Sequence, residues 1–281
     1  MKILIWTGYQ TPHWNKSTWD NKGIGGSEYC VLKLAEYFTK QDHNVIVSGD
    51  VVDGKFNGVQ YLHYDKFLEW RGPVSHTNPN ALKVFSHFDV VIGSNYIHYL
   101  RHLKDNHITF DKSYFWMHNE DYYRWYKGST LTNTDEYFQS PKLNKIVGVS
   151  KLHEKLLVDN SESLFNYNIS KALDTIYHVE NAIDVNDYTN PLDNKVEGRI
   201  IWSSAPDRGL DFIVQNWDKW KEQRPDLSLV VCLPPYAKDW DKADVSNLKD
   251  VEYKGALNPT QLREEQSKAE YWIYVSNYTE T

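Results

Sequence analysis

The chain has 281 residues, of which 41% are hydrophobic and 25% charged, and it carries a net charge of −7. This composition is that of a globular protein with one large or two medium domains, and it excludes a disordered chain. An acidic chain without a basic block is not expected to bind nucleic acid, so an anionic ligand needs local donors.

The N-terminal residues turn polar at Thr7, and no apolar run approaches the ~20 residues that span a membrane. We therefore expect no signal peptide or transmembrane segment and take a cytoplasmic location as the default. Cys30 and Cys232 fall in an expected helix and an expected strand, which indicates core thiols. No Cys/His spacing suggests zinc, so no metal site is expected. Peripheral membrane contact and a homo-oligomer both stay open.

The chain opens with a strand expected at residues 3–6 and a glycine-rich turn at 23–28 (GIGGSE). A helix follows, because apolar residues recur with the period of one buried helical face, and Ser27 is its expected N-cap. Such a turn before a helix N-terminus forms an anion site, since Gly25 and Gly26 lack the Cβ atoms that keep a phosphate away. A tight turn without a ligand explains the same glycines equally well.

Strands and helices then alternate. We expect strands at 44–48, 59–64, 89–94, 114–117, 145–149 and 175–179, and helices at 27–40, 95–104 and 150–159. The strand segments are short apolar runs without alternation, as in strands buried on both faces. The pattern indicates a doubly wound α/β fold with a parallel sheet and helices on both sides. Residues 9–22 and 121–141 interrupt it and are expected to be long surface loops.

A polar, turn-prone segment at 190–195 indicates a linker, which divides the chain into domains of residues 1–195 and 196–281. In the second domain we expect strands at 199–203, 228–233, 251–253 and 271–275, and helices at 207–221 and after a capping box that begins at Asn258. A complete doubly wound domain has more elements, so this domain is expected to be incomplete. Either the chain is a fragment or a partner completes the sheet edge.

Three polar segments follow expected strands, where open α/β sheets bind ligands. His118 ends one strand, although a lone histidine is more often structural. Arg208 lies in the expected first turn of a helix, where the dipole disfavours a cation, and neutralising a diphosphate would explain it. An exposed surface arginine is the alternative. Glu280 follows the last strand, where a carboxylate can accept hydrogen bonds from hydroxyls.

Taken together and in this order, the motifs resemble those of nucleotide-sugar-dependent glycosyltransferases of GT-B fold, in the large retaining family four. The resemblance implies two Rossmann-like domains that face a cleft. The GGSE turn resembles the loop that contacts the donor diphosphate, so the resemblance implies that Gly25 and Gly26 bind the diphosphate. His118 resembles the histidine beside the donor sugar. The segments at 149–151 (VSK) and 179–184 (VENAID) are similar to those that precede the family's linker.

The segment at 204–211 (SAPDRGLD) resembles the start of the family's donor-binding domain, with Arg208 as a diphosphate ligand. The last four residues (YTET) resemble the first half of the family's E-x7-E signature, which makes Glu280 the first Glu, in contact with the sugar. Catalytic roles thus fall to His118 and Glu280. Further sugar or nucleotide contacts are expected from Ser27, Asn119, Ser204, Pro206 and Thr281.

The chain departs from the family pattern at several places. Ser203-Ser204 replaces a Gly-Arg pair, and Glu180 and Ala182 stand where Pro and Gly are common. The second Glu of the signature would lie eight residues after Glu280, beyond the end of the chain.

The resemblance implies transfer of a hexose from a nucleoside diphosphate sugar to a saccharide or other hydroxyl acceptor with retention, without a metal or other cofactor. Three alternatives stay open: a non-catalytic sugar- or nucleotide-binding module, a nucleotide-sugar 2-epimerase of the same fold, and a dinucleotide enzyme. The last is least favoured, because G-x-G-x-x-G and an acid ~20 residues later are missing.

Overall fold

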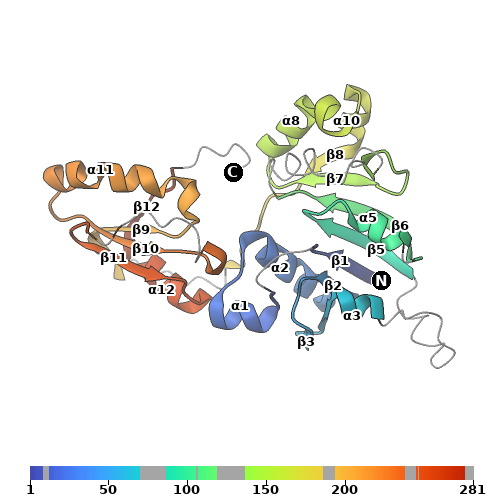
Figure 1. The fold of residues 1–281 in the computed structure, drawn as a ribbon, viewed down its shortest axis with the longest axis horizontal. Helices are drawn as coiled ribbons and strands as arrows, with labels where there is room; N and C mark the ends of the chain where they lie inside the picture. The colour runs from blue at the N-terminus through green and yellow to red at the C-terminus, as the bar shows by residue number, and fades with distance from the viewer. Residues whose placement is uncertain are drawn as a thin grey trace. The chain divides into compact units, whose positions relative to one another are not determined.

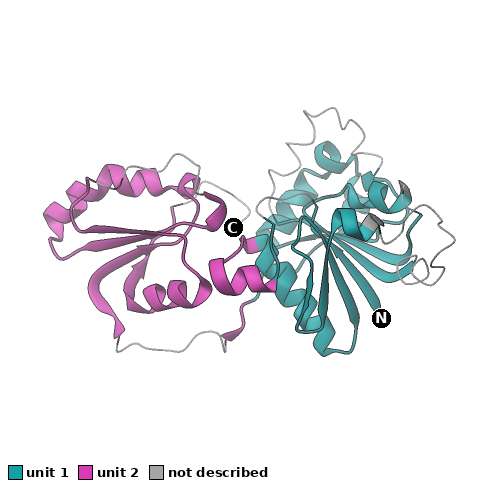
Figure 2. Cartoon of the chain, turned by 60° about the horizontal axis from the view of Figure 1, so that its bottom comes forward, with its two compact units in different colours: residues 1–15, 27–182, 279–281 teal, residues 16–26, 183–278 magenta. Residues whose placement is uncertain are grey.

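The computed structural model of the chain describes residues 1–8, 13–69, 87–105, 107–118, 137–185, 194–237, 245 and 247–275. Within these ranges no helix combines the length and hydropathy that crossing a membrane requires. The chain forms two compact units, residues 1–15 with 27–182 and residues 16–26 with 183–278 (Figure 2).

The first unit is built on an eight-stranded sheet in the order β3-β4-β2-β1-β5-β6-β7-β8 (Figure 1). Its strands are β1 (Lys2–Trp6), β2 (Asn44–Gly49), β3 (Gly54–Phe56), β4 (Val59–His63), β5 (His87–Ser94), β6 (Thr109–Trp116), β7 (Lys145–Gly148) and β8 (Ile176–His178). All neighbouring strands pair in parallel except β3, which is antiparallel to β4. Asn57 and Gly58 join these two with positive φ, as a two-residue hairpin turn requires.

Six helices pack around the described part of this sheet: α2 (Gly26–Lys40), α3 (Tyr64–Glu69), α5 (Tyr99–Asp105), α8 (Lys151–Asp159), α9 (Ser161–Phe165) and α10 (Ile169–Thr175). The side chain of Ser150 caps α8 by accepting a hydrogen bond from the His153 N–H. Ile3, Leu4, Ile5 and Trp6 of the central strand β1 are each at most 1% exposed. Burial on both faces explains why the predicted strands read as continuous apolar runs.

The second unit contains a four-stranded parallel sheet in the order β11-β10-β9-β12. Its elements are α1 (Lys16–Lys22), β9 (Val196–Trp202), α11 (Leu210–Gln223), β10 (Ser228–Cys232), β11 (Val251–Gly255), α12 (Pro259–Lys268) and β12 (Ala269–Trp272). Trp202 of β9 and Ile213 and Trp217 of α11 form the centre of its core. The predicted capping box of α12 is confirmed, since Asn258 and Gln261 exchange hydrogen bonds of 2.9 and 3.1 Å.

The predicted parallel α/β architecture is confirmed in both units. The prediction of a loop over residues 9–22 is wrong for residues 16–22, because α1 occupies Lys16–Lys22. No residue of α1 is buried, so the helix carries no apolar stripe that a pattern could detect. An ion pair between Lys16 and Asp20 at 2.5 Å and contacts with α12 support it instead.

Two helix starts also differ from prediction. Helix α2 begins at Gly26, so Ser27 lies inside the first turn and is not the N-cap; its hydroxyl donates to Glu28 Oε2 at 3.1 Å. Helix α5 begins at Tyr99 and not at residue 95, where Asn95 has a φ of +61°, outside the helical region. Of the two cysteines expected in cores, Cys232 is buried and Cys30 half-buried, and both are free.

Two predictions fall largely outside the described residues. These are the linker at 190–195, with the domain boundary that it sets at residue 195, and the loop at 121–141. Both stay predictions.

Candidate functional site

His118 lies just beyond the carboxyl end of β6. Its backbone N–H donates to Asn95 Oδ1 at 2.9 Å, and its ring lies 4.3 Å from the ring of Trp116, measured between centroids. Asn95, buried at the end of β5, donates its own N–H to the Trp116 carbonyl at 2.9 Å. One asparagine therefore fixes the ends of two neighbouring strands and, with them, the position of His118.

The imidazole of His118 is neutral in the folded protein. Burial, and to a smaller extent the nearby His153, lower the pKa of His118 from 6.5 to about 3. Its Nε2 atom is buried and has no hydrogen-bond partner among the described residues. A buried nitrogen without a partner costs about 1–3 kcal/mol, so a ligand hydroxyl that reaches it restores a lost interaction.

The depressed pKa of His118 also links stability to pH. The unfolded chain takes up a proton near pH 6.5, whereas the folded protein takes it up only near pH 3. Above pH 6.5 His118 is neutral in both states, so it adds no pH dependence. As the pH falls from 6.5 toward 3, the unfolded chain binds the proton first, and the free energy of unfolding decreases by up to about 1.4 kcal/mol per pH unit.

The glycines of the turn before α2 have different roles. Gly23 has a φ of +75°, and a Cβ there would lie 3.3 Å from the carbonyl oxygen of Leu257, so the backbone itself requires glycine. At Gly26 a Cβ would meet nothing within 4 Å among the described residues. Among the residues that the structure describes, neither the backbone conformation nor a neighbouring atom requires glycine at position 26. Gly25 lies between them, half-buried.

The first turn of α2 also holds Glu28, next to Ser27. Burial raises the pKa of Glu28, although its own backbone N–H and the Ser27 hydroxyl oppose the shift.

Arg208 lies in a 3₁₀ turn over Pro206–Arg208, before α11 and not inside its first turn as the sequence suggested. Gly209, with a φ of +104°, separates the turn from the helix. A Cβ at Gly209 would lie 1.9 Å from the Val275 carbonyl oxygen, so the backbone after β12 passes directly against this turn. The turn thus lies where the carboxyl ends of β9 and β12 meet.

Two other residues predicted to contact the donor lie in the same connection. Pro206 is buried, and Ser204 is half-buried, with its carbonyl accepting the Trp202 indole N–H at 3.0 Å. Asn119, Glu280 and Thr281 lie outside the described residues, and their roles stay predictions.

In the first unit the structure brings together residues that the sequence analysis did not connect. His118 shares its surroundings with Asn95 and His153 in the first unit. His153 is fully buried, and its Nδ1 accepts the Val149 N–H at 3.3 Å. Asn95 follows an expected strand and His153 follows a helix cap by three residues, which are the only signals the sequence holds for them.

Among the described residues, two groups of histidine and aspartate have ligand atoms close enough to hold a metal ion. They are His13 with Asp50 and His63, and His87 with Asp89 and Asp111. Sequence analysis predicted neither group, because each one combines residues from separate segments of the chain.

No protein-family model matches the chain, and no curated protein matches it by sequence. Solved structures do match it. The chain is similar to the catalytic domain of starch synthase IV from Arabidopsis thaliana bound to ADP and acarbose, with a TM-score of 0.58, 11% identity, and coverage of 99% of this chain and 78% of that one.

It is also similar to a variant of S. aureus TarM in complex with fondaparinux, α-GlcNAc-glycerol and UDP (TM-score 0.64, 10% identity, 100% and 82% covered). A third similar structure is WaaG, a glycosyltransferase involved in lipopolysaccharide biosynthesis (TM-score 0.55, 12% identity, 98% and 75% covered). These proteins have the GT-B fold. At such identities the likeness shows the fold alone, and the chain has a Rossmann-like fold of the GT-B type.

Proposed function

We propose that the chain is a glycosyltransferase that moves a hexose from a nucleoside diphosphate sugar to a hydroxyl acceptor with retention of configuration. The observation that carries this proposal is the likeness in fold to the three solved structures, which extends over 98–100% of the chain. One of those structures is bound to ADP and acarbose, and another to UDP and saccharides. The order of the motifs around Gly26, His118, Arg208 and Glu280, which resembles that of retaining family four, supports it.

The main chemical need of this reaction is to stabilise the departing diphosphate. We assign that task to the Arg208 guanidinium and to the backbone N–H groups of Gly25 and Gly26 at the start of α2. Preorganised donors aimed at developing charge are the largest single source of catalysis in many enzymes. Because these donors stabilise the negative charge of the departing diphosphate, the proposed reaction uses no metal. The nucleotide sugar is a substrate and not a resident cofactor.

His118 and Glu280 orient the donor sugar in this proposal. A neutral imidazole with an unpartnered Nε2 can accept a hydrogen bond from a sugar hydroxyl. The carboxylate of Glu280 accepts another. Orientation of this kind matters because a misplacement of ~1 Å can cost ~100-fold in rate. Asn119, Ser27, Ser204, Pro206 and Thr281 are proposed as further contacts to the sugar or nucleotide. The acceptor proton passes to the departing phosphate, so no protein base is assigned.

A panel of UDP-, GDP- and ADP-sugars tests the proposal, read by released nucleoside diphosphate with and without saccharide acceptors. Product with the donor's anomeric configuration in NMR spectra is the expected result. An epimerised nucleotide sugar formed without an acceptor would instead indicate an epimerase. Nucleotide binding without turnover, in this chain and in one extended past Thr281, would indicate a binding module.

A further inference from the structure

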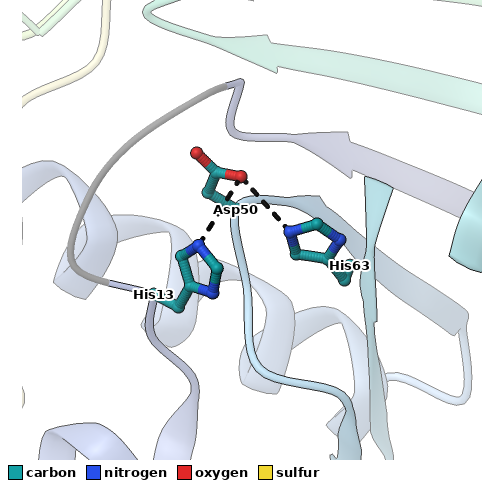
Figure 3. A group of neighbouring side chains, drawn as sticks. All are labelled: His13, Asp50 and His63. Atoms are coloured by element: carbon teal, nitrogen blue, oxygen red, sulfur yellow. Dashed lines mark ion pairs between the residues drawn. The ribbon is translucent and has the colours of Figure 1, made fainter. Parts of the chain in front are cut away.

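A group of three side chains that plays no part in the proposed transfer lies at the carboxyl edge of the first unit's sheet. Asp50 directly follows β2, and His63 is the last residue of the neighbouring parallel strand β4. Because Gly49 pairs with His63 in the register of these strands, Asp50 and His63 emerge side by side. His13, from the segment after β1, faces both of them (Figure 3).

The backbone holds each of the three residues in place. Trp14 pairs with Val51 in an isolated parallel bridge, and the Val52 N–H donates to the Trp14 carbonyl at 2.9 Å. The Trp14 side chain is 2% exposed and packs edge-on against Tyr61, with 6.0 Å between ring centroids. His13 therefore extends from an anchored residue. The Asp50 N–H donates to the Gly8 carbonyl at 2.9 Å, which ties the start of the same segment to β2.

We propose that His13, Asp50 and His63 form a binding site for a divalent first-row metal ion, with zinc as its best occupant. Two imidazoles and one carboxylate are one of the ligand sets that three-ligand zinc sites use. His63 Nε2 lies 3.4 Å from Asp50 Oδ1, and His13 Nε2 lies 4.0 Å from the same oxygen. All the ligand atoms lie within 4.8 Å of one another.

These distances suit a tetrahedral ion. Bonds of about 2.0–2.2 Å in tetrahedral geometry put neighbouring ligand atoms about 3.4 Å apart. The Asp50–His63 pair already has this spacing. The His13–Asp50 distance of 4.0 Å is about 0.6 Å longer than this, and the His13 side chain, 51% exposed, is free to turn toward the ion. Three protein ligands leave the fourth position to water.

A second layer of contacts supports His63 as a ligand. The Asp53 carboxylate accepts the His63 backbone N–H at 2.8 Å. The Asp65 backbone N–H donates to His63 Nδ1 at 3.4 Å, and Asp65 Oδ2 lies 3.6 Å from the same nitrogen. An ion bound at Nε2 would select the tautomer with a proton on Nδ1, so that Nδ1 would no longer accept from the Asp65 N–H and would donate to the Asp65 carboxylate instead. Carboxylate partners of this kind orient metal-bound histidines and strengthen them as ligands.

An ion at this position would cross-link three segments: the one after β1, the end of β2 and the end of β4. The site would therefore stabilise the sheet edge. The other histidine–aspartate group is a poorer candidate, because its side chains are more exposed: 48% for His87 and 64% for Asp111, against 20% for His63 and 12% for Asp50. Asp89 Oδ2 accepts the Lys2 N–H at 2.6 Å, and His87 Nδ1 lies 2.8 Å from Thr109 Oγ1. His87 thus offers a matched control.

The test is calorimetric titration of the chelator-treated chain with Zn²⁺, with Co²⁺ absorption as a second readout. We expect one tightly bound ion in the unaltered chain and in His87→Gln. His63→Gln and Asp50→Asn should weaken binding by more than 100-fold, since even loss of a second-layer partner costs about 10–100-fold. Asp65→Asn should weaken Zn²⁺ binding by about 10- to 100-fold. Zn²⁺ should raise the melting temperature only where the site is intact.

Equal Zn²⁺ affinity in the unaltered chain and in His63→Gln would overturn the proposal, as would a Co²⁺ spectrum of the six-coordinate aqueous ion. If Asp50→Asn fails to fold, His13→Gln decides, because that side chain is half exposed and its loss leaves the core intact. Neither donor nor acceptor is present in these titrations, so their result does not depend on the proposed transfer.

Discussion

Replacing Gly26 by alanine separates a glycine that serves the fold from one that serves a ligand. The added Cβ meets no described atom within 4 Å, and the position is the first of α2. Alanine is the better helix former by as much as about 1 kcal/mol, so Gly26→Ala should leave the free energy of unfolding unchanged or raise it.

Donor affinity should respond in the opposite way. The methyl group occupies the space through which a phosphate approaches the N–H groups at the start of α2. Loss of one charged hydrogen bond costs about 1.5–3 kcal/mol, which corresponds to a dissociation constant larger by about 10- to 150-fold. Calorimetric titration with a nucleoside diphosphate measures this change, and urea unfolding measures stability in parallel.

Gly23→Ala is the matched control. Its φ of +75° and the Leu257 carbonyl at 3.3 Å make alanine strained there, so stability should fall by about 1–2 kcal/mol. The folded fraction should still bind the nucleotide as before. Unchanged nucleotide affinity in Gly26→Ala would refute the assignment of this turn to the diphosphate, however well the sequence fits the family pattern.

Four further outcomes are expected. Arg208→Ala should weaken diphosphate binding by about 1.5–3 kcal/mol in calorimetry, and an unaltered heat of binding would remove Arg208 from the site. His118→Gln should flatten the loss of unfolding free energy between pH 6 and pH 4, because the pKa of His118 is lowered to about 3; the same slope in both proteins would contradict its burial. Glu280→Gln should lower turnover more than it lowers the melting temperature, and equal losses would mark Glu280 as structural. Asn258→Ala removes the cap of α12 and should cost about 1 kcal/mol in urea unfolding, whereas Gln261→Ala should cost less.

The elements that the sequence predicts well are those whose signal is local. β1 is buried on both faces and reads as an uninterrupted apolar run, so its strand was predictable from Ile3 to Trp6. The capping box of Asn258 and Gln261 spans four residues and forms as expected. In contrast, α1 has no buried residue, and it lies in contact with α12, a neighbour far away along the chain. The β3–β4 hairpin was missed although its Asn57-Gly58 turn is a local signal.

The sequence by itself determined the alternation of strands and helices, and with it the doubly wound class of fold, because burial of each strand is written in its own residues. Only the tertiary structure decided which side chains meet. Strand order and register bring His13, Asp50 and His63 together, and the cap of α8 brings His153 close enough to affect the pKa of His118. Contacts of this kind are set by the pairing of distant segments, which no spacing along the chain records.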